Sequence, residues 1–426
     1  MDAHDHAHAH AHAHDAPSPS LTRGRSVLFG AVLLLVAATV VGLVALWPPS
    51  SASAPKGDAG DRIRATVTTL LRASCGQLLD PGATDKGTPD GCSRARVHID
   101  EGPEKGQSLE LFVGVDQAAS THVGQHVVLF RGAGSLPLDS RYELIDVQRG
   151  RPLLLLAGLF VLAVVVLGRL RGALSLVGLG LSLVVLIEFM VPALLAGRPA
   201  VLTAVVGASA VMILVLVLAH GPNIRTATAM VGTGLALLLI LVLSFVFVKA
   251  TSLTGLTSDE AVYVRSLFGQ IDLRGLLLAG IVIGALGILD DITVTQVSTV
   301  WELRNANAAM PTPELYAAAL RVGRDHIAST VNTLLLAYAG ASMPLLVIFA
   351  TSGDGLVGTA TNAVVAEEVV RTLVGSIGLI AAVPVTTALA AIMCPAASGP
   401  LPAAAPAPDV APTADHEEPR SSRSWT

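Results

Sequence analysis

Residues 273–292 read LRGLLLAGIVIGALGILDDI, and residues 321–344 read RVGRDHIASTVNTLLLAYAGASMP. Both runs join apolar sequence, long enough to belong to membrane spans of about 20 residues, to a dense group of charged and hydrogen-bonding side chains. We expect a first helix that ends on Asp290 and Asp291, a polar loop of about thirty residues, and a second apolar helix. Any functional site is expected in this region.

The composition of the whole chain is that of a membrane protein. Of its 426 residues, 52% are hydrophobic and 14% are charged, whereas soluble globular proteins are about 25% charged. The net charge of −5 is too small to indicate a nucleic-acid partner. The lipid bilayer is therefore the expected environment.

Eight apolar segments are long enough to cross a bilayer. The first is 26–46, and the others are expected at about 152–168, 173–195, 200–220, 228–248, 273–290, 328–350 and 369–393. A cleaved signal peptide is the alternative for residues 26–46, but the length of this run favours an uncleaved helix. The fold class is therefore an all-α polytopic bundle of about eight transmembrane helices, seven of them in residues 151–394.

The basic residues indicate an orientation. Arg23 and Arg25 precede the first span, and further arginines lie in alternate loops, although others lie near the opposite ends of the spans. Both termini are therefore expected in the cytoplasm, and residues 50–150 outside it.

Residues 50–150 predict a small β domain. Five stretches alternate apolar with polar residues between Gly, Pro and Asp clusters: 62–72, 95–100, 108–115, 126–131 and 142–148. An OB-like barrel is the preferred fold. A disulfide between Cys75 and Cys92 would add about 3 kcal/mol to the stability of so small a domain, and Cys394 is left without a partner.

The two ends of the chain predict disordered cytoplasmic tails. Residues 1–25 contain six alternating histidines, and residues 395–426 are rich in Pro and Ala. Imidazoles at this density can bind zinc, nickel or copper loosely, although a tail whose metal affinity is incidental is the favoured interpretation. The possible metal ligands are His4, His6, His8, His10, His12 and His14.

Gly280, Gly284, Gly287 and Asp291 follow one another at spacings of four, three and four, so they share one helix face. A face with so little side-chain bulk predicts the close approach of a neighbouring helix. Helix packing is the favoured role of the glycines, while the two adjacent acids suit a functional or a structural role equally.

The second helix carries a wider polar face. Arg321, Asp325, Ser329 and Asn332 lie on one side, and His326 and two threonines widen it. Such a face is costly in lipid, so we expect it to meet a protein interior or a hydrated cavity. The alternative is that the arginines are interfacial anchors and the other side chains bond to neighbouring helices.

We expect Asp290 or Asp291 to oppose Arg321, Arg324 or His326, as an ion pair or a proton relay. The carboxylates and the histidine suit a cation, whereas the two arginines suit an oxyanion, so the charge of the solute stays open. The candidate transport or ligand site comprises Asp290, Asp291, Thr295, Arg321, Arg324, Asp325, His326, Ser329 and Asn332.

Two smaller patterns accompany this site. Residues 220–223, His-Gly-Pro-Asn, predict a tight turn between two spans. Glu367 and Arg371 lie four residues apart at the start of the last span and are expected to pair.

The run from Gly323 to Pro344, together with residues 287–296, resembles the signature of YibE/F-like bacterial membrane proteins. The likeness extends from about residue 62 to 384, but not to the histidine tail or to the Cys75/Cys92 pair. It implies a multi-span protein of the bacterial plasma membrane and a transporter whose substrate is not settled.

The leading functional hypothesis is therefore transport of a small ion or solute, with no catalytic residue and no cofactor, in a chain that can form an oligomer. A membrane sensor or assembly protein that transports nothing is the alternative. An intramembrane enzyme, with Asp290 or Asp291 and Asp325 as a carboxylate pair, is the third reading. No established intramembrane-protease motif surrounds these residues.

Overall fold

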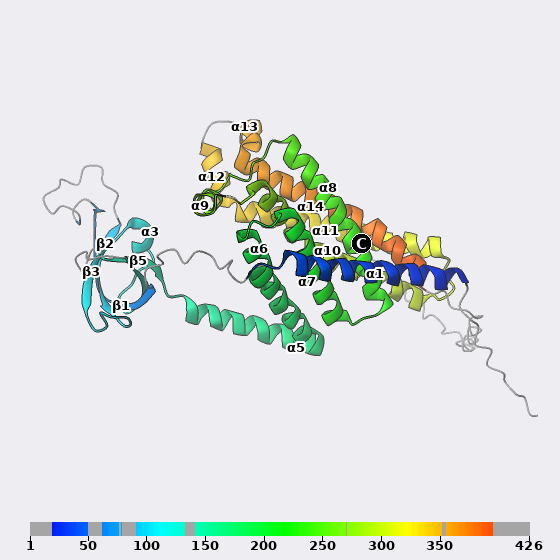
Figure 1. The fold of residues 1–426 in the computed structure, drawn as a ribbon, viewed down its shortest axis with the longest axis horizontal. Coiled ribbons are helices and arrows are strands. Elements are labelled where there is room, and N and C mark those ends of the chain that lie inside the picture. Colours follow the sequence, from blue (N-terminus) through cyan, green and yellow to red (C-terminus); the bar gives the residue numbers. More distant parts are fainter. Residues whose placement is uncertain are drawn as a thin grey trace, which may run out of the picture.

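The computed structural model describes residues 19–49, 62–75, 78, 91–132, 141–269, 271–351 and 355–394. They form a small β-sheet domain, which follows the first helix in the chain, and a bundle of long helices (Figure 1). The protein is therefore mostly helical, as the apolar composition predicts.

Five antiparallel strands form the sheet, in the order β3-β2-β1-β4-β5. Their bounds are Arg62–Ala73 for β1, Cys92–Ile99 for β2, Ser108–Val113 for β3, His126–Arg131 for β4 and Tyr142–Val147 for β5, with the one-turn helix α3 (Val115–Ala118) before β4. All five strands were expected within a few residues. No backbone ladder joins β3 to β5 in the described chain, so the closed OB-like barrel stays a prediction.

The inward side of the sheet is a single apolar core. Its members alternate along each strand, as in Ile63, Ala65 and Val67 of β1, because successive side chains of a strand point to opposite faces. Cys75 and Cys92, the pair expected to be bridged, are joined by a disulfide where β2 begins.

Long apolar helices make up the bundle. In chain order they are α1 (Pro19–Leu46), α5 (Gly150–Val184), the π-helix η1 (Val185–Met190), α6 (Val191–Leu195), α7 (Ala200–His220), α8 (Ile224–Ala250), the short α9 (Asp259–Leu267), α10 (Leu273–Ala306), α11 (Thr312–Ala341), α12 (Met343–Thr351), α13 (Gly355–Thr361) and α14 (Ala363–Met393). Six segments of the described chain are long and apolar enough to cross a membrane, or seven if α11 and α12 form one bent span.

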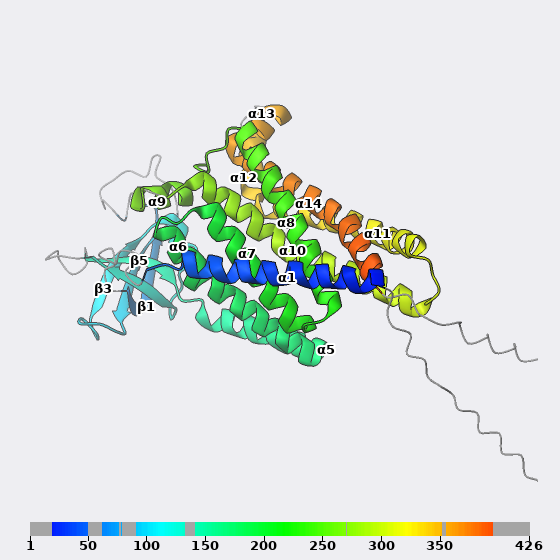
Figure 2. The ribbon, with the colours of Figure 1, turned by 45° about the vertical axis from the view of Figure 1, so that its right-hand side comes forward.

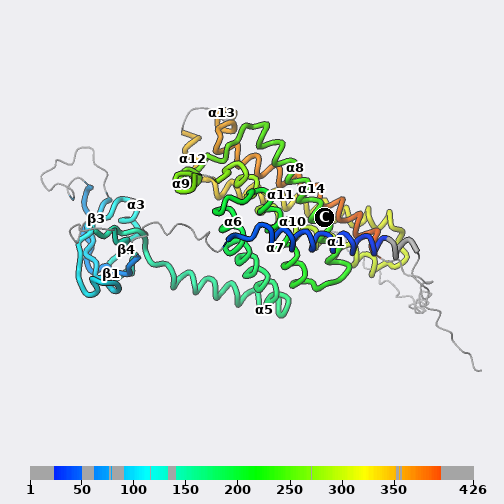
Figure 3. The backbone as a smooth tube through the Cα atoms, in the orientation of Figure 1, coloured from blue at the N-terminus to red at the C-terminus, as the bar shows by residue number. Residues whose placement is uncertain are grey.

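One of these six segments, Gly150–Leu195, has 46 residues and is bent. Its helix is broken at Arg169, where φ is 51°. Figure 3 shows the backbone turning back in this segment toward α6. Gly172 permits the turn, because a Cβ there would overlap the carbonyl oxygen of Val164. The bend agrees with the two spans expected at 152–168 and 173–195, and a total of eight crossings stays a prediction.

The bundle has two recognisable ends. At the first, which we call the His220 end, the turn after His220 lies near the last third of α10 and Gly24 of α1 lies near Met393 of α14. At the other, the Trp47 end, Trp47 stacks on Phe189 with ring centroids 5.9 Å apart. Figure 2 shows α1 running along the bundle, where it packs against α7.

The boundaries expected for the central pair of helices were wrong. The first helix does not end on Asp290 and Asp291, because α10 continues without a break to Ala306. The polar segment beyond the acids keeps an apolar stripe at helical spacing, which includes Val297, Val300 and Trp301 and is buried. The expected thirty-residue loop shrinks to residues 307–311.

The second helix also differs from the expectation of residues 328–350. It begins at Thr312, ends at Ala341 and is followed by α12 at a bend of 67°. Pro344 lies in the first turn of α12, where the missing N–H and the ring interrupt the helical hydrogen-bond pattern. The arginines and the polar face therefore belong to a continuous helix that starts before the apolar segment.

The interior of the bundle is formed by α8, α10 and α14. Small residues bring these helices together, since a Cβ at Gly378 of α14 would overlap Ile240 of α8, and one at Gly232 of α8 would overlap Thr386. The close approach of α8 and α14 fixes the helices that surround the candidate site.

Candidate functional site

Asp290 lies in the part of α10 that packs inside the bundle. One carboxylate oxygen, Oδ1, is buried and has no hydrogen-bond partner among the described residues. The hydroxyl group of Thr293 donates a hydrogen bond to the Asp290 carbonyl oxygen at 3.2 Å, and the Thr233 hydroxyl of α8 lies 2.7 Å from that of Thr293. A carboxyl group at membrane depth costs about 2.5–3.5 kcal/mol to insert when it is charged, so its placement here needs a compensating role.

Asp290 lines a cavity of about 420 Å³. The walls come from the second half of α5, from η1, from α7 and from α10, and most of the lining is apolar. Asp290 alone is ionisable among the described residues that line it, and Ser175 and Ser182 add hydroxyl groups. Gly207, Val211 and Val215 of α7 face the cavity, so it lies within the apolar length of that helix.

The π-helix η1 forms one wall of this cavity through Met190. The Met190 side chain packs over Gly207, where a Cβ would overlap its sulfur atom. Such π-turns are rare and occur frequently at functional sites. The wider turn of the π-helix η1 therefore sets the shape of one wall of the Asp290 cavity.

On its other side Asp290 adjoins a row of buried hydroxyl and amide groups. The Thr233 and Thr293 hydroxyl oxygens lie 2.7 Å apart. One turn further along α10, Gln296 donates to the Thr387 hydroxyl of α14 at 2.9 Å. Asp290 therefore lies between an apolar cavity and a polar strip within the bundle.

Asp291 occupies a different position from Asp290. Its side chain is exposed, on the same face as Gly280 and Gly287. In the described chain no atom lies within 4 Å of a Cβ built on either glycine, and the nearest atom at Gly284 is the Tyr338 hydroxyl at 3.9 Å. The close helix approach expected along this face was wrong, because the flanking helices pack on other sides of α10.

The polar face of α11 points away from the bundle. Arg321, Arg324, Asp325, Ser329 and Asn332 are all exposed. The opposite side of α11 packs against α10 and α14 through apolar residues and small residues, which include Leu315, Ala319, Gly323, Ile327, Val331 and Leu334.

The helices of the described chain do not cover this polar face, so the expectation that it meets a protein interior or a hydrated cavity stays a prediction. The apolar side of α11 packs against α10 and α14, whereas no helix of the described chain packs against the polar side. His326 and Thr330, at the flank of the face, are half-buried.

The described residues contain no ion pair between Asp290 or Asp291 and the arginines or the histidine of α11. Thr295 is half-buried, and its carbonyl oxygen accepts a hydrogen bond from the Thr299 hydroxyl at 2.9 Å. Of the nine candidate residues, Asp290 has a buried carboxylate oxygen, Thr295 and His326 are half-buried, and the other six are exposed. Asp290 lines the cavity, whereas the side chains of Asp291 and Asp325 are exposed.

The two smaller patterns are present. The turn after His220 places Gly221 at a φ of 75°, and the Asn223 side chain accepts a hydrogen bond from the Thr226 N–H to cap α8. Arg371 pairs with Glu367 at 3.1 Å, as expected, and also with Glu368 at 2.6 Å.

Sequence reasoning missed Thr233. Its signal was the run Gly-Thr-Gly at 232–234, which places a hydroxyl group between two small residues in the middle of an apolar helix. It also missed Arg304, which is buried and donates to the Met310 carbonyl oxygen across the short turn from α10 to α11.

Within the described residues, no group of three or more His, Cys, Asp or Glu side chains is placed to hold a metal ion. The six histidines of residues 4–14 lie outside the described residues, as do residues 1–18 and 395–426 of the two predicted tails. Residues 19–25 were expected in the first tail but belong to helix α1.

The long apolar helices and the buried carboxyl group define a multi-pass helical membrane protein. The family model described as YibE/F-like protein matches residues 156–396, which is more than half of the chain, so the chain belongs to the YibE/F-like family. The matched range begins after the sheet and contains the whole Asp290 cavity. Searches among curated proteins and among solved structures gave no significant match.

Proposed function

We propose that this protein is a bacterial plasma-membrane transporter of a small ion or solute, in which Asp290 is the ion-handling group. The observation that carries the proposal is the buried, unpartnered Oδ1 atom of Asp290 beside a cavity of about 420 Å³. A carboxyl group in apolar surroundings binds a proton or a small cation when one reaches it, and returns to a costly charged state when the cation leaves.

Asp290 has a cavity on one side and hydroxyl groups on the other, and a cation could approach or leave the carboxyl group along either side. The cavity lies toward α5 and α7, and the hydroxyl groups of Thr233 and Thr293 lie toward α8. Hydroxyl groups both donate and accept hydrogen bonds, so they suit the relay of a proton or the partial coordination of a desolvated cation. The transported solute is therefore a cation, or a solute whose movement is coupled to a proton.

The test is flux through the purified full-length protein in liposomes. Proton flux is followed with an enclosed pH-sensitive dye, and a panel of monovalent and divalent cations and small metabolites is presented outside. We expect Asp290→Asn to reduce flux at least tenfold, because the amide keeps the size of the carboxyl group but cannot bind and release a proton.

Asp291→Asn is the matched control, because the neighbouring acid is exposed and does not line the cavity. Flux in this variant is expected to stay close to that of the wild-type protein. Absence of flux across the whole panel, or equal flux in the wild-type and Asp290→Asn proteins, would contradict the proposal and favour the sensor or assembly role.

We also propose that a second copy of the chain covers the exposed face of α11. Asn332 and Ser329 lie among apolar residues, and polar groups at membrane depth are costly unless they find a partner. The face carries Arg321 and Asp325 one turn apart, so two copies related by a two-fold axis can pair each arginine with the aspartate of the other copy. The Asn332 amides, which both donate and accept, can pair across the same axis.

A further inference from the structure

A second cavity lies at the His220 end of the bundle and has a different chemistry from the Asp290 cavity. Its volume is about 370 Å³, within the range of small-ligand pockets. It is bounded by the turn of α5, the last turn of α7, the first turn of α8 and one face of α10.

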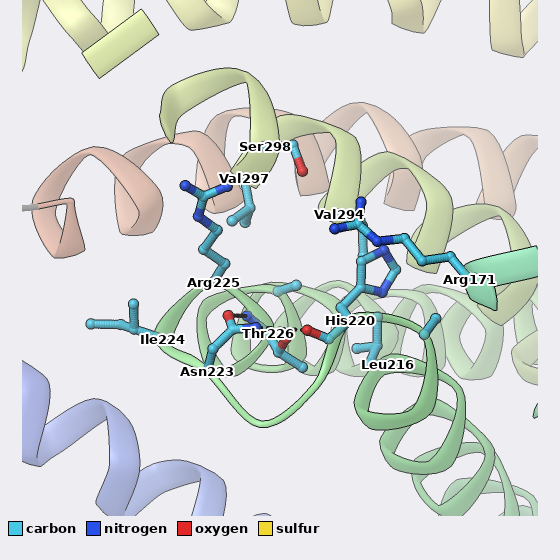
Figure 4. A pocket seen from close by; sticks show the side chains of 12 residues that line it. Arg171, Leu216, His220, Asn223, Ile224, Arg225, Thr226, Val294, Val297 and Ser298 are labelled. Atoms are coloured by element: carbon cyan, nitrogen blue, oxygen red, sulfur yellow. Dashed lines mark hydrogen bonds between the residues drawn. The ribbon is translucent and has the colours of Figure 1, made fainter. Parts of the chain in front are cut away.

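Basic side chains line this cavity on two sides. Figure 4 shows Arg225 on one side and Arg171 beside His220 on the other, with Ser298 of α10 between them. No Asp or Glu is among the described residues that line it. Two guanidinium groups facing one space make it attractive to an anion.

The two arginines remain available to a ligand. Arg171 has an exposed side chain and forms no ion pair within the described chain. Arg225 has one acidic neighbour, the exposed Glu302, at 3.7 Å, and its guanidinium lies 5.7 Å from the centre of the Trp301 ring. An exposed ion pair of this length contributes little and is easily exchanged for a better anion.

The depth of the cavity in the bilayer indicates which class of anion can reach it. His220 is the last residue of α7, a helix of 21 residues that is just long enough to cross the hydrocarbon core. Its end therefore lies at the level of the lipid headgroups. Guanidinium groups bind the oxygens of phosphate in bidentate geometry, and basic pockets between transmembrane helices bind phosphate-bearing headgroups.

The cavity lies next to the Asp290 cavity along the same helices. Val294 and Ser298 line the basic cavity on α10, and they follow Asp290 at intervals of four residues on the same helix. On α7 the Asp290 cavity extends to Val215, and the basic cavity begins at Leu216. An anion bound at Arg171 and Arg225 would thus lie between the Asp290 cavity and the His220 end of the bundle.

We infer that the cavity between α5, α7, α8 and α10 binds an anionic phosphate group through Arg171 and Arg225. The group belongs either to free phosphate or to the headgroup of an anionic lipid. The inference rests on the basic cavity alone. A failure of phosphate binding would therefore say nothing about transport through Asp290, and the reverse also holds.

Binding can be measured with the full-length protein in detergent. Trp301, next to Arg225, is a local fluorescent reporter once Trp47→Phe and Trp425→Phe have removed the other two tryptophans. The probes are inorganic phosphate at constant ionic strength, and phosphatidylglycerol compared with phosphatidylcholine, each lipid added in mixed micelles. We expect a saturable change in Trp301 fluorescence with phosphate or with phosphatidylglycerol.

Arg171→Gln and Arg225→Gln are expected to weaken this binding about tenfold or more, because each removes a charged hydrogen-bond donor. The Arg171 side chain forms no ion pair within the described residues, so Arg171→Gln keeps the test valid if Arg225→Gln disturbs α8. Arg25→Gln is the matched control, because Arg25 lies at the same end of the bundle and does not line the cavity.

The outcomes distinguish the sources of the phosphate group. Saturation by inorganic phosphate identifies free phosphate, while a response to phosphatidylglycerol alone identifies a lipid headgroup. The inference is overturned if neither probe binds, or if Arg25→Gln weakens binding as much as Arg171→Gln does.

Discussion

Gly378 and Gly375 lie one turn apart on α14 and have different surroundings. A Cβ at Gly378 would overlap the side chain of Ile240 on α8, whereas no atom lies within 4 Å of a Cβ at Gly375 in the described chain. Gly378→Ala is therefore expected to destabilise the protein by about 1–3 kcal/mol, through overpacking of the α8–α14 contact.

Thermal unfolding of the purified protein in detergent measures this effect. Gly375→Ala serves as the control, and its unfolding temperature is expected to match or exceed that of the wild-type protein, because Ala favours a helix. An equal fall in the unfolding temperature of the two variants would show that overpacking of the α8–α14 contact is not the cause.

Glu104 is a second residue whose surroundings allow a prediction. It accepts a hydrogen bond from the Tyr142 hydroxyl at 2.6 Å, and Arg131 lies 3.1 Å from its other oxygen. The Tyr142 hydrogen bond, followed by the nearby arginines, lowers the pKa of Glu104. Burial and the bond to Glu104 raise the pKa of Tyr142 to about 12.

Because the pKa of Glu104 is lower in the folded state, its contribution to stability is present above the unfolded value of about 4.5 and is lost as the pH falls through the folded value. Acidification below 4.5 is therefore expected to reduce hydrogen-exchange protection of β5 in the full-length protein. Glu104→Gln should show lower protection at neutral pH and a smaller acid effect. An unchanged acid profile in this variant would assign the loss to another carboxylate.

At the scale of the element, α11 shows which features of a helix can be predicted from its sequence. The spacing of Arg321, Asp325, Ser329 and Asn332 correctly placed them on one face. What this face meets depends on the lateral position of α10 and α14, which lie on the other side of the helix. Helical periodicity contains no information about that position.

Cysteine cross-linking tests the proposed covering of this face by a second copy. In membranes that contain the Cys394→Ser protein, oxidation is expected to join Asn332→Cys or Ser329→Cys into a covalent dimer. Leu334→Cys is the control, since Leu334 packs against the α10 and α14 side. A dimer with Leu334→Cys, or none at either polar position, would exclude the proposed arrangement.

The boundaries of α10 illustrate a second limit at this scale. Hydropathy marks where a helix leaves the apolar layer, but it does not mark where the helix ends. Beyond Asp291 the chain keeps an apolar stripe at intervals of three and four residues, so α10 extends into the polar region. This apolar stripe is a signal in the sequence itself, and it outweighs the two adjacent acids.

For the whole molecule, the sidedness of the bundle is the main testable feature. Arg171 and His220 line one cavity, so the bend at Arg169 lies at the His220 end, together with the turn between α10 and α11. We expect this end in the cytoplasm and α9 at the outer side, because Arg23 and Arg25 precede α1.

Labelling of single cysteines by a membrane-impermeant maleimide checks this topology in intact cells that produce the Cys394→Ser protein. Asp259→Cys is expected to react in intact cells, and Asn307→Cys only after permeabilisation. Arg169→Cys should behave like Asn307→Cys if Gly150–Leu195 crosses the membrane twice. Reaction of Arg169→Cys in intact cells would rule out the hairpin and the total of eight crossings.

By itself the sequence determined the membrane class, the five strands and the polar face of α11, because hydrophobic content and periodicities of two and 3.6 residues are local properties. The tertiary structure alone decided the roles of the central pair of helices. It turned the face from Arg321 to Asn332 outward, and it gave Asp290, not Asp291, a cavity. The physical reason is that a cavity is formed by helices distant in the chain, here α5, η1 and α7 around α10, whose packing depends on small residues such as Gly207 and Gly172.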